Sequence, residues 1–300
     1  MTSSLGPLPV VDEPARPFVK WVGGKTQLLP ELRKRVPKIF GRYYEPFAGG
    51  AALFFDLASS SCGHWPKDKG LTCLTWADLN DANPWITTAY KAVRSQPENV
   101  IDVLRAMQDR YREDGNAYYY DIRANMDVDA SLAQKAAVFI FLNKTNYNGL
   151  WRVNRAGGYN VPHGKRKTPP VICDEDNIRR VSRVLQHVSI TTGDFELAVK
   201  GAARGDFVYF DSPYVPVSAS SDFTAYTKEP FGPAEQTRLR DCALALKARG
   251  VKVMLSNADV PFVRELYRQD YGFKIERVEA RRNVNSKGDR RGKVAEVIIT

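Results

Sequence analysis

The chain has 300 residues, and 43% of them are hydrophobic, which suffices for one large core with a smaller inserted lobe. Lys and Arg total 44 against 34 Asp and Glu, so the formal net charge is +10. An excess of this size favours a polyanionic partner. Nucleic acid is expected before membrane, because the sequence has no cationic amphipathic helix, no run of about eighteen apolar residues and no signal-peptide pattern.

The cysteines and histidines are too dispersed for a zinc site or a disulfide framework. The four cysteines include no CxxC pair, and the three histidines lie far apart along the chain. We therefore expect no metal and no disulfide, and a reducing cytoplasm as the location. The residues concerned are Cys62, Cys73, Cys173, Cys242, His64, His163 and His187.

The N-terminal part predicts a flexible leader over residues 1–16, which contain three prolines, and ordered structure from Phe18 onward. Gly24-Lys25-Thr26 resembles the end of a phosphate-binding P-loop. That motif requires a glycine five residues before Gly24, where the chain has Val19. The P-loop is therefore excluded, and the apolar spacing that follows predicts a helix closed by Pro37.

The next segment is typical of a strand that runs into a helix. Tyr43 to Phe47 is followed by Gly49-Gly50 and by a helical pattern from about Ala51 to Ala58. Small residues at such a turn let a ligand approach the backbone at the helix N-terminus. A Gly-Gly turn without a ligand is equally compatible with these residues.

A second predicted strand covers Leu71 to Ala77 and ends in Asp78. An acid at the end of the second strand of an α/β sheet suits the hydroxyls of a ribose. A helix cap before Pro84 is an equally good interpretation of the same residue.

From about Pro84 to Asn143 the pattern is helical, with segments at 85–93, 100–111 and 132–142, which predicts a helical insertion between two parts of the sheet. The following stretch, up to Lys167, mixes cations, rings and asparagines around a Gly-Gly pair typical of a hairpin. Such a mixture suits phosphates and base edges, although a solvated basic loop stays open. The residues are Tyr147, Trp151, Arg152, Arg155, Gly157, Gly158, Tyr159, Lys165, Arg166 and Lys167.

The second half continues the alternation of strands and helices. A strand at 188–192 precedes Gly193-Asp194-Phe195 and a helix to Ala203, and another strand starts at Asp206. Further helices are expected at 233–248 and 261–269, and further strands at 251–255, 273–279 and 294–299. Residues 215–231, with Phe223 and Tyr226, suggest a mobile lid. The last turn could clamp a nucleic-acid backbone or simply be solvated, through Arg281, Arg282, Lys287, Arg290, Arg291 and Lys293.

The strand that starts at Asp206 stops at Asp211-Ser212-Pro213-Tyr214. Ligands of open α/β sheets bind outside the carboxyl ends of strands, and Pro213 stiffens this turn. Asp211 and the Ser212 carbonyl could each accept a hydrogen from an exocyclic amine, while Tyr214 stacks on its ring. An ordinary strand-to-loop turn is the alternative for these four residues alone.

Taken together and in order, these stretches resemble the Dam-type adenine-N6 DNA methyltransferases. The resemblance covers nearly everything from Phe18 to the C-terminus and extends through Phe223-Thr224-Ala225-Tyr226 and Ser256-Asn257. It rests on seven motifs in register, which are Lys20-Trp21-Val22-Gly23-Gly24-Lys25, Glu45-Pro46-Phe47-Ala48-Gly49-Gly50, Ala77-Asp78-Leu79-Asn80, Asn148-Gly149-Leu150-Trp151-Arg152, Asn160-Val161-Pro162-His163-Gly164, Gly193-Asp194-Phe195 and Asp211-Ser212-Pro213-Tyr214.

The resemblance implies a Rossmann-like α/β sheet that binds S-adenosylmethionine, with an inserted helical and β-hairpin region that recognises DNA. The implied boundaries are a leader at 1–16, a catalytic domain at 17–82 and 188–300, and a target-recognition region at 83–187. It also implies double-stranded DNA as the partner, a location at the nucleoid through DNA, no membrane and no metal. A monomer is expected, with a dimer on DNA as the alternative.

By resemblance, the turn after the Asp206 strand holds a flipped adenine, and Ser212 departs from the family's Asp-Pro-Pro-Tyr. The lysine beside the donor-site tryptophan and the hairpin would read GATC, and Tyr147 and Asn148 would stabilise the opened duplex. The implied catalytic residues are Asp211, Ser212, Pro213 and Tyr214. The implied donor-binding residues are Trp21, Lys25, Phe47, Gly49, Asp78, Asp194, Phe195 and Asp211, and the implied DNA-binding residues are Lys20, Tyr147, Asn148, Leu150, Arg152, Asn154 and Pro162.

Three alternatives stay open at this point. One is a methyltransferase of another planar amine, in an RNA base or a protein glutamine, and a second is an inactive DNA-binding relative, to which Ser212 lends weight. A nicotinamide oxidoreductase is disfavoured because the chain lacks GxGxxG. A role in restriction, in a phage or in housekeeping is equally open.

Overall fold

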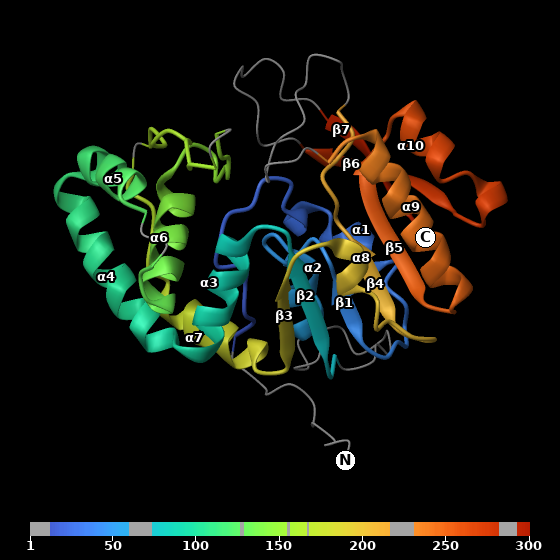
Figure 1. Ribbon diagram of the computed structural model, residues 1–300, viewed down its shortest axis with the longest axis horizontal. Coiled ribbons are helices and arrows are strands. Elements are labelled where there is room, and N and C mark those ends of the chain that lie inside the picture. Colours follow the sequence, from blue (N-terminus) through green and yellow to red (C-terminus); the bar gives the residue numbers. More distant parts are fainter. Residues whose placement is uncertain are drawn as a thin grey trace.

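The computed structural model describes residues 13–59, 74–126, 129–154, 157–166, 168–216, 231–281 and 293–300. Its strands are β1 (Tyr43–Glu45), β2 (Ala77–Asp81), β3 (Val188–Thr192), β4 (Phe207–Phe210), β5 (Lys252–Ala258), β6 (Ile275–Arg281) and β7 (Lys293–Ile299). Within the described ranges they form one seven-stranded sheet in the order β3-β2-β1-β4-β5-β7-β6 (Figure 1). The first five strands in this order are parallel, whereas β7 is antiparallel to both neighbours. The predicted α/β sheet is confirmed.

Helices cover both faces of the sheet. The side chains of the central strands point alternately to the two faces, and each face is buried in its own hydrophobic core. In β4, Phe207 and Tyr209 enter one core, and Val208 and Phe210 enter the other. The first core is shared with α1 (Leu29–Arg33), α2 (Ala52–Ser59) and α3 (Pro84–Ser95), and the second with α8 (Phe195–Ala198), α9 (Pro233–Ala248) and α10 (Pro261–Leu266). Two single turns, η1 (Lys25–Gln27) and η4 (Gln269–Tyr271), complete these layers.

A helical lobe lies beside the β3 edge of the sheet (Figure 1). It consists of α4 (Pro97–Glu113), α5 (Gly115–Ala124) and α6 (Leu132–Thr145), and α7 (Glu175–Leu185) returns the chain to β3. Helix α6 begins with a reciprocal capping box between Ser131 and Gln134. The predicted helical insertion is confirmed, and α7 is a helix that the sequence analysis missed.

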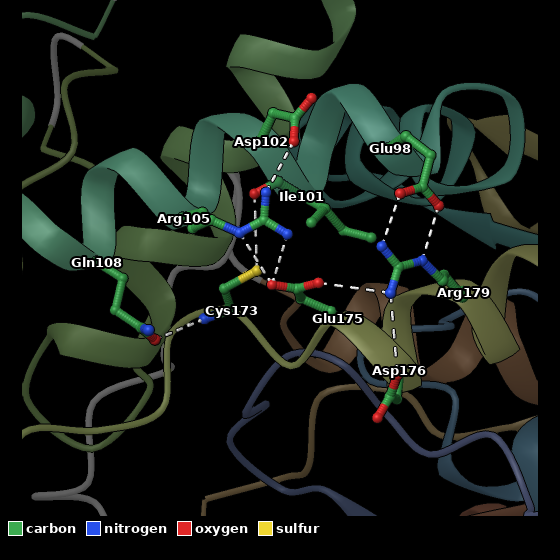
Figure 2. Close-up of polar contacts among 9 residues, drawn as sticks. All are labelled: Glu98, Ile101, Asp102, Arg105, Gln108, Cys173, Glu175, Asp176 and Arg179. Atoms are coloured by element: carbon green, nitrogen blue, oxygen red, sulfur yellow. Dashed lines mark hydrogen bonds and ion pairs between the residues drawn. The ribbon is translucent and has the colours of Figure 1, made fainter.

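An ion-pair network joins α4 to α7 (Figure 2). Arg105 of α4 pairs with Glu175 of α7 at 2.8 Å, and Arg179 of α7 pairs with Glu98 of α4 at 2.8 Å. Arg179 also reaches Glu175 at 3.4 Å, which connects the two pairs. A single exposed pair contributes at most about 1 kcal/mol, but connected arginine forks also fix orientation. The network therefore holds the lobe against the helix that leads into the sheet.

The chain after α6 folds into the predicted hairpin, at the end of the lobe that faces the carboxyl ends of the parallel strands (Figure 1). Isolated antiparallel bridges join Asn146 to His163 and Val153 to Tyr159. The expectation that Trp151 and Tyr159 offer their rings to nucleic acid is wrong. The two rings are 1% and 9% exposed and pack on each other with centroids 4.6 Å apart. They belong to the hydrophobic core.

Three predicted boundaries differ from the structure. Strand β2 covers Ala77–Asp81 and therefore begins where the predicted strand at 71–77 ended; the described residues 74–76 are not part of a strand. Helix α8 ends at Ala198, well before Ala203. The first helix is only the five-residue α1, because a separate turn, η1, precedes it.

Several predictions concern residues outside the described ranges. These are most of the leader, the proposed lid with Phe223 and Tyr226, hairpin residues Arg155 and Lys167, and the loop cations Arg282, Lys287, Arg290 and Arg291. The end of the predicted leader is described, and it packs on α7: the Arg16 N–H donates to Asn177 Oδ1 at 2.9 Å. In the described part of the chain, no helix combines the length and apolar character needed to cross a bilayer.

Candidate functional site

The order of the strands places two loops next to each other at the carboxyl edge of the sheet. Strand β1 pairs with β2 on one side and with β4 on the other. Successive strands are therefore added in one direction from β1 to β3 and in the opposite direction from β4 onward, although all five strands are parallel. Ligands of open α/β sheets bind at such a switch point. The loop after β1 carries Phe47 and Gly49, and the turn after β4 carries Asp211 to Tyr214.

The centre of the site is an ion pair between Lys25 and Asp211. Lys25 Nζ lies 2.7 Å from Asp211 Oδ1, donates to the Gly23 carbonyl at 2.5 Å and sits 4.6 Å from the centroid of the Tyr214 ring. Lys25 is only 5% exposed. Burial raises the pKa of Asp211 to about 6, and the positive charge of Lys25 opposes that rise. Asp211 is therefore a carboxylate at neutral pH because Lys25 accompanies it.

A second acid, Glu45 at the end of β1, lies close enough to interact electrostatically with both Asp211 and Lys25. Its Oε2 accepts a hydrogen bond from the Tyr43 hydroxyl at 2.8 Å, and burial raises its pKa to about 8. Glu45 is therefore mostly protonated at neutral pH, so Lys25 balances the charge of Asp211 rather than that of Glu45. Glu45 stands in one of the motifs that carry the resemblance, but its sequence context assigns it no role.

The remaining residues of the turn after β4 are held from other elements. The Tyr214 hydroxyl donates to Glu296 Oε2 of β7 at 2.7 Å. Ser212 is 3% exposed, and its hydroxyl has no hydrogen-bond partner among the described residues. The structure thus brings together Lys25 and the four predicted turn residues, and it adds Glu296, which the sequence analysis did not identify.

Aromatic side chains surround the loop after β1. Phe47 stacks on Phe195 with ring centroids 5.3 Å apart, and Phe231 meets both rings edge-on. Gly49 has a positive φ of 46°, and a Cβ there would lie 2.5 Å from Trp21 Cδ1. Only glycine fits this contact without displacing the tryptophan. The predicted residues Trp21, Phe47, Gly49 and Phe195 therefore line one region.

The predicted residue Asp194 caps α8 and also forms an ion pair. Its Oδ1 accepts the Glu196 N–H at 2.9 Å, and its Oδ2 pairs with Arg238 of α9. The Arg238 guanidinium lies 4.4 Å from the centroid of the Phe195 ring. Arg238 was not identified from the sequence, since its partners lie some forty residues earlier in the chain.

Asp78 lies elsewhere than the sequence analysis expected. It is the second residue of β2, opposite Tyr44, and its carboxylate pairs with Arg42 at 3.0 Å near the start of the strands. The acid at the carboxyl end of β2 is Asp81, whose Oδ2 accepts the Gly49 N–H at 2.9 Å. The expectation that Asp78 ends the strand is wrong, because β2 lies further along the chain than the pattern indicated. Its contact with a donor stays a prediction that rests on the resemblance alone.

The predicted DNA-facing residues lie on the hairpin and on the segment that precedes the Lys25 turn. Tyr147 is 40% exposed, Asn148 has a φ of 60°, and the Tyr147 N–H donates to the Pro162 carbonyl at 2.9 Å. Arg152 Nε donates to Asn160 Oδ1 at 2.8 Å. Lys20, Arg152, Asn154 and Pro162 are exposed, and Leu150 is half-buried.

A buried asparagine of α6 connects these two segments. Asn143 Oδ1 accepts the Lys20 N–H at 2.7 Å, and its Nδ2 donates to the Lys20 carbonyl at 2.7 Å and to the Gly149 carbonyl at 3.3 Å. A Cβ at Gly149 would lie 2.7 Å from the Lys20 carbonyl oxygen. The hairpin turn therefore packs directly on Lys20, in the segment that precedes Trp21 and Lys25.

A groove of about 400 Å³ lies beside Lys20, and Lys144 and Arg166 also line it. Lys20 is exposed as a whole residue, but partial desolvation beside this groove and the charge of Arg166 lower its pKa. This basic groove borders the hairpin and is separate from the Asp211 turn. Among the described residues, no group of three or more His, Cys, Asp or Glu side chains is arranged to hold a metal ion.

Comparison with known proteins gives concordant matches. Residues 21–284 match the family described as D12 class N6 adenine-specific DNA methyltransferase. "Type II methyltransferase M1.LlaDCHI" of Lactococcus lactis subsp. cremoris is 40% identical over 292 residues, which covers 95% of each chain. "Type II methyltransferase M.MjaIII" of Methanocaldococcus jannaschii is 38% identical, over 92% of this chain and 95% of the relative. "DNA adenine methylase" of Haemophilus influenzae is 30% identical, over 94% and 92%.

Proposed function

The chain belongs to the family of D12 class N6 adenine-specific DNA methyltransferases, and we propose that it methylates N6 of the adenine in GATC within duplex DNA. Its reaction class, its dependence on S-adenosylmethionine and its action on DNA follow from family membership. The observation that carries the residue-level proposal is the arrangement of Lys25, Asp211 and Tyr214 at the turn after β4.

The substrate adenine must leave the duplex before its N6 can reach this turn, at a cost of a few kcal/mol in lost stacking and pairing. We assign the support of the opened duplex to Tyr147 and Asn148, at the exposed turn of the hairpin. The exposed ring of Tyr147 and the fixed backbone of this turn, bonded to the Pro162 carbonyl, support the assignment.

The flipped base would then be held by the turn after β4. The Asp211 carboxylate and the Ser212 carbonyl each accept one hydrogen from the N6 amine, and the Tyr214 ring stacks on the base. Lys25 already occupies one face of that ring, so the base takes the opposite face. Two acceptors on N6 favour a tetrahedral nitrogen with an available lone pair. Positioning and fixed charges of this kind lower a barrier by roughly 10 kcal/mol when the geometry is good.

The residues around Gly49 fit S-adenosylmethionine. The half-buried ring of Phe47, supported by the buried Phe195 stacked on it, offers an apolar surface to its adenine. The absence of a Cβ at Gly49 leaves backbone accessible beside Trp21, and the Asp211 carboxylate suits a cationic donor. When bound, the donor supplies an electrophilic methyl group on its sulfonium, which N6 takes without a covalent enzyme intermediate. Asp194, which now pairs with Arg238, completes the set that we assign to the donor.

The GATC assignment rests on four positions matched by resemblance: Lys20, Leu150, Arg152 and Pro162. Three of these are exposed and one is half-buried, so they are available to a duplex docked on the hairpin. Asn143 holds Lys20 and the hairpin turn together, which supports their action on one DNA site.

The function is tested with tritiated S-adenosylmethionine and three duplexes: one with GATC, one with its adenine replaced, and one of random sequence. We expect label on the GATC duplex alone. Label on the random duplex but not on GATC would reject the target and keep the reaction. Label on none of the three duplexes, and none on genomic DNA as a fourth substrate, would favour the inactive DNA-binding relative.

Gly49→Ala tests the donor pocket. The new Cβ would collide with Trp21 and force a non-glycine residue to a positive φ, so we expect donor affinity to fall at least about tenfold. Isothermal titration with S-adenosylmethionine measures it. Gly232→Ala is the matched control, since a Cβ there meets no atom within 4 Å and its φ is −89°. Equal affinity of the two variants would contradict the assignment of Gly49.

A further inference from the structure

Two buried amide side chains hold the backbone of the turn after β4. Gln236 of α9 donates from Nε2 to the Pro213 carbonyl at 2.7 Å. Asn257 of β5 accepts the Val215 N–H on its Oδ1 at 3.1 Å and donates from Nδ2 to Gln236 Oε1 at 3.0 Å. The two amides are 0% and 2% exposed. They form a continuous chain of hydrogen bonds from the Pro213 carbonyl to the Val215 N–H, on either side of Tyr214.

The backbone fixes the direction of this chain. Asn257 Oδ1 accepts two main-chain N–H groups, from Val215 and from Ala258 at 2.8 Å, so it must be the oxygen. Its Nδ2 then faces Gln236, which turns the Gln236 oxygen toward Asn257 and leaves the Gln236 nitrogen for the Pro213 carbonyl. Because both amides are buried, water cannot replace a lost bond without rearrangement. The pair therefore accepts only one orientation of the Pro213 carbonyl.

The turn has a specific need for such support. The family motif has proline where this chain has Ser212, so one backbone restraint is missing. The Ser212 carbonyl, proposed above to accept from N6, belongs to the peptide unit that immediately precedes Pro213. The Pro213 ring is rigid, and its carbonyl and the Val215 N–H are both held by hydrogen bonds. Because the backbone that follows Ser212 is fixed in this way, the Ser212 carbonyl can adopt fewer orientations. Tyr214, between the two held groups, is anchored as well by Glu296.

We propose that Gln236 and Asn257 are positioning residues for adenine methylation, which keep the Ser212 carbonyl and the Tyr214 ring in the geometry that the flipped base requires. This inference rests on the proposed function of the turn. The hydrogen bonds of these two amides restrain the backbone of the turn, as a second proline would. It acts on the methyl-transfer step and leaves the affinity for donor and DNA nearly unchanged, because neither amide lies at the surface.

The first test is Gln236→Met, which keeps the length of the side chain and removes both polar atoms. We expect the single-turnover rate of methylation of a GATC duplex to fall about tenfold, since one buried hydrogen bond to the turn and its partner are lost. Dissociation constants for S-adenosylmethionine and for DNA should change less than twofold. Retained donor binding also shows that the variant is folded.

The matched control is Gln108→Met in α4. Gln108 is likewise bonded to backbone, since its Oε1 accepts the Ile172 N–H at 2.9 Å. It also accepts the Cys173 N–H at 3.1 Å (Figure 2). It lies in the helical lobe, away from the Asp211 turn. Its single-turnover rate should equal that of the wild-type protein.

Rescue separates positioning from a general structural role. The Ser212 N–H makes no backbone hydrogen bond among the described residues, so Ser212→Pro removes no such bond while it stiffens the turn. Added to Gln236→Met, it should restore the rate at least threefold.

Asn257→Asp provides a second variant. The two oxygens of its carboxylate would turn the Gln236 nitrogen toward residue 257 and away from Pro213, and the rate should fall as in Gln236→Met.

An unchanged rate in Gln236→Met, or a loss that Ser212→Pro does not relieve, would overturn the inference while the wild-type protein still methylates GATC. A wild-type protein without activity on any duplex would instead reject the proposed function. The two failures are therefore distinguishable in one set of assays.

Discussion

Asp211→Ala should lower the single-turnover rate of methylation by about a thousandfold or more. The substitution removes an acceptor of the N6 amine, and single charge-stabilising contacts in active sites account for about 100-fold to 1000-fold in rate. It also leaves the buried Lys25 without its carboxylate partner, 2.7 Å away in the structure. Donor affinity should weaken only partly, since Trp21, Phe47 and Phe195 are untouched.

Quench-flow assays with tritiated donor measure the rate, and titration of donor and of a GATC duplex measures binding. Asp241→Ala is the control, because Asp241 is an exposed acid that pairs with its neighbour Arg240. A rate within tenfold of wild type would contradict the role of Asp211. Lost donor binding together with an altered thermal unfolding profile would show instead that Asp211 acts by holding the fold.

The chemistry of the turn was accessible from sequence because it is local. Asp211 to Tyr214 are consecutive, and a strand followed by a proline predicts where their side chains leave the sheet. The pairing of Lys25 with Asp211 could not be predicted from local sequence, since only the fold brings these two residues together. The resemblance implied its presence at the donor site, but the ion pair and the contact with the Tyr214 ring come from the structure.

The supports of the turn could not be predicted, because they depend on how distant elements are placed in space. Glu296, Gln236 and Asn257 contact the turn from β7, α9 and β5. Asn257 stands in a stretch that carries the resemblance, but nothing in the sequence connects any of the three side chains with the turn. Burial was the other weak point. Trp151 and Tyr159 alternate with polar residues as an exposed aromatic surface would, but they pack into the lobe.

Two errors had signals in the sequence. Helix α7 begins after Asp174, which caps it by accepting the Asn177 N–H, and Ile178, Val181, Val184 and Leu185 have helical spacing. The other error concerns the position of β2, which covers Ala77–Asp81 rather than 71–77. Leu79 and Asn80, directly after Asp78, are both buried, and Leu79 indicates that the strand continues past the acid.

Lys25→Met should lower kcat/KM at pH 7 by about a hundredfold or more, and the loss should depend on pH. In the wild-type protein kcat/KM should rise with pH through the pKa of Asp211, about 6, because only the carboxylate accepts from N6. Burial raises that pKa and Lys25 opposes the rise, so removal of Lys25 must move it to higher pH. We expect the acid limb of the profile to shift upward by at least one unit.

The profile separates two roles of Lys25. A contact with the donor alone would lower kcat/KM by the same factor at every pH, whereas loss of the charge that keeps Asp211 ionised leaves a deficit that shrinks as pH rises. The charge of Glu296 raises the pKa of Asp211, and Glu45, with a pKa of about 8, adds a second negative charge as the pH rises; both effects keep this recovery incomplete. Lys34→Met, which removes a lysine paired with Glu31 on the surface, is the control and should leave the profile unchanged. A uniform loss in Lys25→Met with an unmoved acid limb would show that the Lys25–Asp211 pair does not set the charge of the catalytic acid.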